Sequence, residues 1–167
     1  MIELQNICFE YGSEEQNIAG RGALHNINLH IPDGQIVLLC GESGCGKTTI
    51  TRLLNGLIPH FYEGNLTGTI CIDGKEINDQ SLYETALLSG TVFQNPRSQF
   101  FNVDTTSELA FGLENRGMEE TQILKKVDKT VQELKLEKLM NRSIFDLSGG
   151  EKQKIACGCV SVCSPNI

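Results

Sequence analysis

The stretch from Gly41 to Thr49, read GESGCGKTT, follows directly after the apolar run from Gln35 to Cys40. It fits the pattern G-x-x-x-x-G-K-[ST], in which glycines allow a tight turn whose backbone N–H groups point at phosphate oxygens. Lys47 can reach the β- and γ-phosphates, and the Thr48 hydroxyl can bind Mg²⁺. The helix expected after the loop turns its positive N-terminal end toward the anion. The stretch therefore predicts a site for a nucleoside triphosphate.

The residues around this loop predict the structural setting that phosphate binding requires. The run from Gln35 to Cys40 has the length and apolar content of a buried strand. After the loop, apolar side chains at Ile50, Leu53, Leu54 and Leu57 recur at helical spacing. The predicted order is strand, loop and helix. The loop residues expected to contact the nucleotide are Gly41, Glu42, Ser43, Gly44, Cys45, Gly46, Lys47, Thr48 and Thr49.

Length and composition are those of a soluble domain. The 167 residues, 40% of them apolar, are enough for one domain with a substantial core. The net charge of −7 argues against a general nucleic-acid surface, because lysines and arginines are not clustered to neutralise a phosphate backbone. Apolar runs are shorter than the roughly 18 residues of a membrane span, and the N-terminus lacks a signal-peptide pattern. We therefore expect a soluble, cytosolic chain.

The seven cysteines and three histidines lack the spacing of a metal site. Because no C-x-x-C pair occurs, we expect reduced and mostly buried thiols. Cys45 lies inside the phosphate-binding loop, where we interpret it as a small, tolerated residue that contributes its backbone N–H. Alkylation of this thiol would still block nucleotide entry.

The remaining chain is rich in predicted strands in its first half and in predicted helices in its second half. Strands are expected at Ile2 to Tyr11, Leu24 to Ile31, Gly64 to Ile72, Lys75 to Ile77 and Thr91 to Phe93. Helices are expected at Ser81 to Leu88, from Thr105 onward, and at about Glu119 to Lys135. Ser13 to Gly22 is expected to be a loop. Thr105 and Glu108 fit a capping box at the start of their helix.

A second informative stretch, Leu147 to Gln153, reads LSGGEKQ and enters a predicted helix. Exposed backbone N–H groups, a hydroxyl and the helix dipole converge at such a helix start and favour an anion. Ser148 and Glu151 also fit an ordinary capping box, which needs no ligand. Taken alone, the stretch is compatible with both interpretations.

The phosphate-binding loop, Gln94 at the end of a predicted strand, a helical segment and LSGGEKQ, in this order, resemble the nucleotide-binding domain of ABC (ATP-binding cassette) ATPases. The resemblance covers the entire chain. The segments CGESGCGKTT, LNGLIPHFYEGNLTG and VFQNPRSQFF look most like the ATPase subunits of energy-coupling-factor importers, which take up vitamins or cobalt and nickel ions. The implied fold is α/β: a P-loop NTPase with an incomplete RecA-like core, an N-terminal antiparallel β-subdomain and an α-helical subdomain. The implied borders are 1–94 for the β-subdomain and core, 95–157 for the helical subdomain and 158–167 for the return to the core.

The resemblance implies a role for each residue that matches a family motif. Tyr11 matches an aromatic that stacks on adenine, although a tyrosine that merely ends an edge strand fits the same position. Gln94 matches the Q-loop glutamine, which touches Mg²⁺ and the attacking water, and the alternative is an exposed glutamine in a turn. Lys47 and Gln94 would then act in catalysis, and Thr48 and Gln94 would bind Mg²⁺. The signature residues expected at the ATP of an opposite subunit are Ser148, Gly149, Gly150 and Gln153.

The resemblance also implies partners. In the family a signature meets ATP only across a head-to-tail dimer, so that function requires a second ATPase subunit or cassette. Membrane-embedded subunits dock near the segment that matches Arg97 to Asn102, which places the ATPase at the cytoplasmic face of the cell membrane. Phe100 and Phe101 could line that groove, although packing within the helical segment explains them equally well. No nucleic-acid partner is expected.

The sequence departs from the family pattern in two mild ways and one serious way. Glu151 stands where glutamine is usual, and Lys154 stands where arginine is common. The chain stops at Ser164 to Ile167, where the family continues into the strand that carries the Walker B aspartate and the catalytic glutamate. No residue here is assigned as the general base. We therefore expect an inactive, marginally stable fragment with exposed apolar surface.

The function implied for the full-length protein is ATP binding and hydrolysis coupled to substrate uptake across a membrane. One alternative is a non-transport ABC ATPase that acts as a nucleotide-gated clamp on DNA or the ribosome. The absence of basic patches and of a coiled-coil insertion weighs against the clamp. Another alternative is a fragment that only binds nucleotide. The transported substrate is not specified, because in the family a separate membrane subunit selects it.

Overall fold

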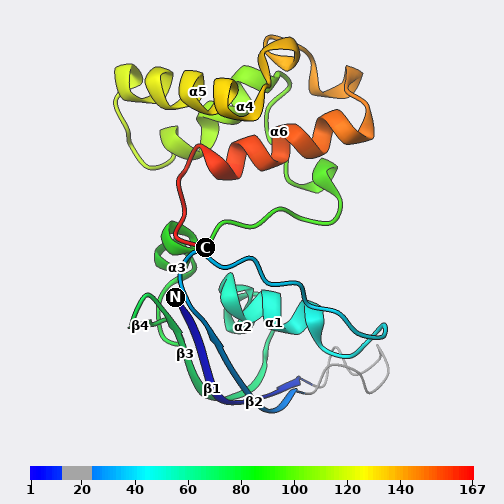
Figure 1. Ribbon diagram of the computed structural model, residues 1–167, viewed down its shortest axis with the longest axis vertical. Coiled ribbons are helices and arrows are strands. Elements are labelled where there is room, and N and C mark those ends of the chain that lie inside the picture. Colours follow the sequence, from blue (N-terminus) through cyan, green and yellow to red (C-terminus); the bar gives the residue numbers. More distant parts are fainter. Residues whose placement is uncertain (13–23) are drawn as a thin grey trace. The chain divides into compact units, whose positions relative to one another are not determined.

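The structure is a computed structural model that describes residues 1–12 and 24–167 (Figure 1). Contacts divide these residues into two compact units. The first, which we call the sheet unit, comprises Met1–Ser89 and Asn166–Ile167, and the second, the helical unit, comprises Gly90–Pro165. The predicted loop from Ser13 to Gly22 lies outside the described residues. The subdomain borders near residues 94 and 157 stay a prediction.

The sheet unit is built on a four-stranded antiparallel sheet in the order β2-β1-β3-β4. β1 (Ile2–Tyr11) lies between β2 (Leu24–Ile31) and β3 (Gly64–Ile72). After a turn at Asp73-Gly74, where both φ angles are positive, β4 (Lys75–Glu76) pairs with the end of β3. The strands predicted at these four positions are confirmed, although β4 is one residue shorter than expected.

β1 contains an irregularity that explains the break in its apolar alternation. The register with β2 shifts between Leu4 and Ile7, and Asn6 within this shift has a positive φ of 50°. Asparagine adopts this left-handed conformation more readily than most residues, and an extra residue in one strand moves the following side chains to the other face. Leu4, Ile7 and Phe9 consequently join one buried core despite their uneven spacing.

The described residues of the sheet unit form three helices: α1 (Lys47–Leu54), α2 (Leu57–His60) and α3 (Leu82–Leu88). α1 begins at the phosphate-binding loop, as predicted, and Leu53 on its inner face is completely buried. The shared core consists of Leu4, Ile7, Phe9, Leu24, Leu53, Ile58, Ile70, Ile72 and Ile77. Each fully buried aliphatic side chain contributes about 1.5–3 kcal/mol to folding. This burial fixes α1, and with it the end of the loop, against the sheet.

The helical unit contains α4 (Thr105–Glu114), α5 (Glu120–Leu134) and α6 (Gly149–Ser161). α5 is amphipathic, as its sequence predicts, and buries the stripe Ile123, Val127, Thr130 and Val131. The core of the unit consists of Leu109, Leu113, Ile123, Val127, Val131, Leu136, Leu139, Leu147, Ile155 and Val162. The unit thus has an apolar core of its own.

The start of α4 differs from the prediction. Asp104, not Thr105, is the N-cap, because its carboxylate accepts two backbone N–H groups of the first turn at 3.0 and 2.9 Å. Thr105 is buried, and its hydroxyl donates to a backbone carbonyl at 2.7 Å. The buried carboxylate of Glu108 accepts the N–H groups of Phe101 and Asn102 at 3.0 and 2.7 Å. The capping box predicted for Thr105 and Glu108 is therefore wrong.

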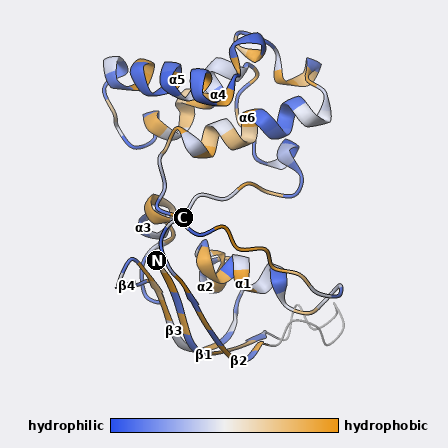
Figure 2. Cartoon of the chain, in the orientation of Figure 1, coloured by the Kyte–Doolittle hydropathy of each residue, from blue (hydrophilic) through white to orange (hydrophobic). Residues whose placement is uncertain are grey.

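The two apolar runs predicted as further strands, Gln35 to Cys40 and Thr91 to Phe93, are not strands. A strand needs hydrogen bonds from a neighbour, and no strand in the described part of the chain pairs with either run. Solvent exposure still alternates along the first run. Ile36 and Leu38 are 102% and 83% exposed, whereas Val37 and Leu39 are 45% and 37% exposed. Figure 2 shows this run as a hydrophobic trace in orange. Apolar surface is thus exposed here, as expected.

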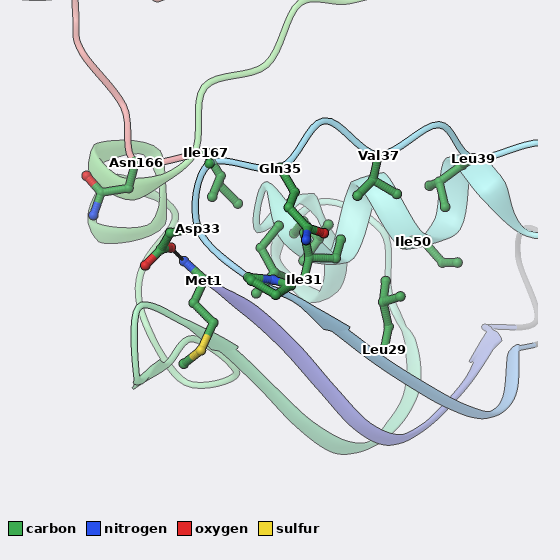
Figure 3. A pocket seen from close by; sticks show the side chains of 14 residues that line it. Met1, Leu29, Ile31, Asp33, Gln35, Val37, Leu39, Ile50, Asn166 and Ile167 are labelled. Atoms are coloured by element: carbon green, nitrogen blue, oxygen red, sulfur yellow. Dashed lines mark hydrogen bonds and ion pairs between the residues drawn. The ribbon is translucent and has the colours of Figure 1, made fainter.

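A cavity of about 400 Å³ lies beneath the unpaired run of the sheet unit (Figure 3). Val37 and Leu39 of the run line it together with Leu29 of β2 and Ile50 of α1. These four lining side chains are aliphatic, whereas Asp33, Gln35 and Asn166 add polar groups elsewhere in the lining. We interpret the cavity as incomplete packing beneath the unpaired run.

No helix in residues 1–12 and 24–167 is both long and apolar enough to cross a membrane. All seven cysteines are free thiols. Cys40, Cys45 and Cys157 are exposed and the other four are half-buried, so that the expectation of mostly buried thiols is wrong. The first two are exposed because they lie in the unpaired run and in the phosphate-binding loop.

Candidate functional site

The phosphate-binding loop lies at the surface of the sheet unit and leads into α1. Gly41, Gly44 and Gly46 have φ angles of 156°, 85° and 92°, which residues with a side chain rarely adopt. Gly46 is the N-cap of α1, and a Cβ at this position would lie 2.6 Å from a methyl group of Leu24. A larger residue at position 46 would therefore displace the Leu24 side chain and would be strained at this positive φ.

Lys47 is the first residue of α1, and its side chain folds back over the loop. Its Nζ donates to the carbonyl oxygens of Gly41 and Glu42 at 2.9 and 2.7 Å, and it lies 3.5 Å from the Sγ of Cys45. These two carbonyl acceptors are neutral, so that they hold the ammonium group without cancelling its charge. A charged donor held in this way can attract a phosphate oxygen.

A cavity of about 280 Å³ opens between the loop, α1 and the end of β1. Its lining residues are Tyr11, Gly44, Gly46, Lys47, Thr48, Thr49 and Arg52. The tertiary structure thus brings Tyr11 beside the loop. The other predicted loop residues, Gly41, Glu42, Ser43 and Cys45, form the exposed part of the loop. An ammonium group next to glycine backbone at a helix N-terminus suits a chain of phosphates.

Arg52 lines this cavity although the sequence did not single it out, and it contacts Tyr11 and Tyr62. The Tyr11 hydroxyl lies 3.2 Å from Thr49 Oγ1 and accepts a hydrogen bond from Arg52 Nη1 at 3.0 Å. The Arg52 guanidinium in turn lies over the ring of Tyr62, 3.7 Å from its centroid. Arg52 lies one helical turn after the loop, and this spacing could have indicated from the sequence that it lies close to the nucleotide site. Tyr62 carries no such signal, because only the fold brings it here.

The LSGGEKQ stretch opens α6 in the helical unit. Ser148 is the N-cap, and its Oγ accepts the backbone N–H of Glu151 at 3.3 Å. The Glu151 carboxylate accepts the Ser148 N–H at 2.7 Å, so that the predicted capping box is confirmed. Hydrogen bonds from Ser148 and, to a lesser extent, from Arg142 at 3.1 Å hold the pKa of Glu151 below its usual value.

The surface around this cap is open. Ser148, Gly149 and Gly150 are exposed, as is Gln153 one turn further along α6. Apart from the local backbone of α6, no atom of the described residues lies within 4 Å of the point where a Cβ would stand on either glycine. Backbone N–H groups at the start of α6 are therefore accessible to another molecule, and the capping box does not exclude the anion-binding interpretation.

Gln94 lies in an exposed segment of the helical unit, before a 3₁₀ turn at Pro96–Ser98. The structure thus places Gln94 and the P-loop lysine in different units. Phe100 packs against the core of the helical unit. Phe101 is 76% exposed and stacks on Phe111, with ring centroids 5.1 Å apart. The two phenylalanines therefore differ, and only Phe101 presents most of its surface to solvent.

A protein-family model described as ABC transporter matches residues 24–167. The chain belongs to this family. A candidate ABC transporter ATP-binding protein of Treponema denticola is 53% identical over the entire chain, which spans 33% of that relative. A candidate ABC transporter ATP-binding protein of Pyrococcus abyssi is 36% identical, again over the entire chain, which spans 58% of it.

The ABC fold is also apparent from a solved structure. CbiO1 of Clostridium perfringens, described as part of the ABC transporter complex CbiONQ, superimposes with a TM-score of 0.82 at 27% sequence identity. The match covers 98% of this chain and 62% of CbiO1. The expected ABC family and its α/β P-loop NTPase fold are therefore confirmed.

Proposed function

We propose that this chain is the ATP-binding part of an ABC importer of the energy-coupling-factor type, which couples ATP binding and hydrolysis to substrate uptake. The observation that carries the proposal is the cavity beside Lys47, where glycine backbone, an ammonium group and the N-terminus of α1 converge. The likeness to CbiO1, part of a transporter complex, supports an importer. Because the chain spans only part of its relatives, the activity belongs to the full-length protein.

In this proposal, the sheet unit holds the nucleotide. The backbone of Gly44 and Gly46 and the ammonium group of Lys47 would bind the β- and γ-phosphates. The exposed Thr48 would offer its hydroxyl to Mg²⁺, which supplies positive charge for the developing transition state. Tyr11, in the wall of the same cavity, would stack on the adenine ring.

Two motifs of the helical unit would contribute to ATP hydrolysis. Gln94 would touch the same Mg²⁺ as Thr48 and the attacking water, with Lys47 as the other catalytic residue. Ser148, Gly149, Gly150 and Gln153 would contact the γ-phosphate across a head-to-tail dimer. Their exposure supports this role, since groups that serve another molecule must be accessible. No residue of the chain is proposed as the general base.

The exposed ring of Phe101 would contact membrane-embedded subunits at the cytoplasmic face of the membrane. Aromatic residues are enriched at protein–protein interfaces, and Phe101 is 76% exposed while Phe111 supports its ring. Co-purification of the full-length protein with membrane subunits would support the importer. Co-purification with DNA or ribosomes alone would contradict it in favour of the nucleotide-gated clamp.

A binding experiment tests the nucleotide site itself. Lys47→Ala removes the ammonium group of the loop and is expected to abolish ATP binding, measured by equilibrium dialysis with Mg²⁺. Lys75→Ala on β4 is the matched control, because it removes an exposed lysine outside the cavity and should leave the affinity unchanged. If Lys47→Ala retained the affinity of the unmodified chain, the proposed site would be wrong.

A further inference from the structure

Arg52 connects the phosphate-binding helix to two tyrosines. It lies on α1, lines the nucleotide cavity and is half-buried. Its Nη1 donates to the hydroxyl of Tyr11 at 3.0 Å, and its guanidinium lies 3.7 Å from the ring centroid of Tyr62. A guanidinium over an aromatic face is attracted by the ring quadrupole, more strongly where water is partly excluded. The Tyr62 ring therefore holds the Arg52 guanidinium in place, and Arg52 in turn donates a hydrogen bond to the Tyr11 hydroxyl.

Tyr11 depends on side chains for its orientation. It is the last residue of β1, and its ring packs edge-on against Phe9 with centroids 4.8 Å apart. Its hydroxyl has two partners, Arg52 and Thr49 Oγ1 at 3.2 Å. Phe9 is completely buried and supports one side of the ring, whereas Arg52 and Thr49 fix the hydroxyl end. The ring also packs edge-on against Tyr62, with centroids 6.3 Å apart, so that removal of the Arg52 donor would leave Thr49 as the remaining hydrogen-bond partner of the Tyr11 hydroxyl.

The alternative role for Arg52 is direct binding of phosphate, which guanidinium groups recognise through paired hydrogen bonds. Its donor Nη1 is directed to the Tyr11 hydroxyl, and its planar face is covered by Tyr62. Both contacts hold Arg52 at the Tyr11 side of the cavity, whereas Lys47 is held over the loop by Gly41 and Glu42. The geometry thus separates a cation held over the loop, Lys47, from a cation held at Tyr11, Arg52.

We infer that Arg52, seated on Tyr62, is a positioning residue that fixes Tyr11 for recognition of the nucleotide base. The inference rests on the proposed function, in which Tyr11 stacks on adenine. It assigns Arg52 to the binding of the base and Lys47 to the binding of the triphosphate. Loss of Arg52 therefore weakens ATP binding without weakening the binding of a ligand that has no base.

Two ligands distinguish these roles. Binding of ATP and of inorganic tripolyphosphate to the purified chain is measured by isothermal titration calorimetry. Arg52→Met, which keeps side-chain length but removes charge and donors, is expected to weaken ATP binding about three- to tenfold, as loss of a partly buried cation–π and hydrogen-bond contact implies. Tripolyphosphate affinity should stay within about twofold, whereas Lys47→Ala should abolish binding of both ligands.

A variant cycle tests whether Arg52 acts through Tyr11. Tyr11→Ala removes the ring, and addition of Arg52→Met to this variant should cost no further ATP affinity, because residues that act as a unit are not additive. Equal losses for ATP and tripolyphosphate in Arg52→Met would overturn the inference, since Arg52 would then bind phosphate directly. Unchanged ATP affinity would overturn it as well.

A measurement without nucleotide separates failure of this inference from failure of the proposed function. The chain contains three tyrosines, Tyr11, Tyr62 and Tyr83, and fluorotyrosine labelling gives one ¹⁹F resonance for each. Arg52→Met should shift or broaden the resonances of Tyr11 and Tyr62 and leave the 61% exposed Tyr83 unchanged. An unchanged Tyr11 resonance contradicts positioning even if ATP binds. A shifted resonance in a chain that does not bind ATP contradicts the proposed function and leaves only the structural contact.

Discussion

Ser148 offers a quantitative test of how α6 begins. Its Oγ accepts the Glu151 N–H at 3.3 Å, which satisfies one of the four backbone donors that a helix leaves free at its N-terminus. Ser148→Ala removes this acceptor, and loss of such a cap costs about 1 kcal/mol. Ser148→Asn is the matched control, because asparagine caps a helix about as well as serine. We expect the asparagine variant to be close to the unmodified chain in stability.

The assay is urea unfolding followed by far-ultraviolet circular dichroism, to which the long helices of the helical unit contribute strongly. With a slope of about 1 kcal/mol per molar urea for a small unit, Ser148→Ala should lower the midpoint by about 1 M. An unchanged midpoint for Ser148→Ala would refute the assignment of a stabilising cap. A Ser148→Asn variant as unstable as Ser148→Ala would refute the reasoning from hydrogen-bond acceptors.

The remaining predictions concern one thiol in the loop and one carboxylate in the helical unit. Exposed Cys45 should react quickly with N-ethylmaleimide, and bound ATP should slow this reaction. Cys159 should react slowly, because burial raises the pKa of its thiol. Mass spectrometry measures both reaction rates, and a Cys45 rate that ATP does not change would count against nucleotide binding in the loop. At the start of α4, hydrogen bonds from Ser107 and Thr106 to the Asp104 carboxylate hold its pKa below the unfolded value of about 3.9. Its stabilisation is therefore complete above that value and is lost as the pH falls through the lower folded pKa. Asp104→Asn, which caps without titrating, should flatten the acid side of a Tm against pH curve, and an unchanged acid side would contradict this assignment.

The sequence was most informative where structure is set by residues close together in the chain. The loop from Gly41 to Thr49 and the helix after it were predictable because phosphate binding needs glycine, lysine and a helix start in one continuous segment. The capping box of Ser148 and Glu151 was predictable for the same reason, since its two residues are one helical turn apart. The N-cap of α4 was predicted one residue too late, because the neighbouring Asp104, not Thr105, accepts the hydrogen bonds of the first-turn N–H groups.

By itself the sequence determined the ABC family, the phosphate-binding loop, the strands of the antiparallel sheet and the amphipathic α5, because each of these depends on a local pattern. The tertiary structure decided the rest. The apolar run from Gln35 to Cys40 has the composition of a strand, but pairing depends on a neighbour distant in sequence, which the described chain does not place beside it. Arg52 and Tyr62 enter the site for the same physical reason: contacts between β1, α1 and the segment after α2 are made only when the chain folds.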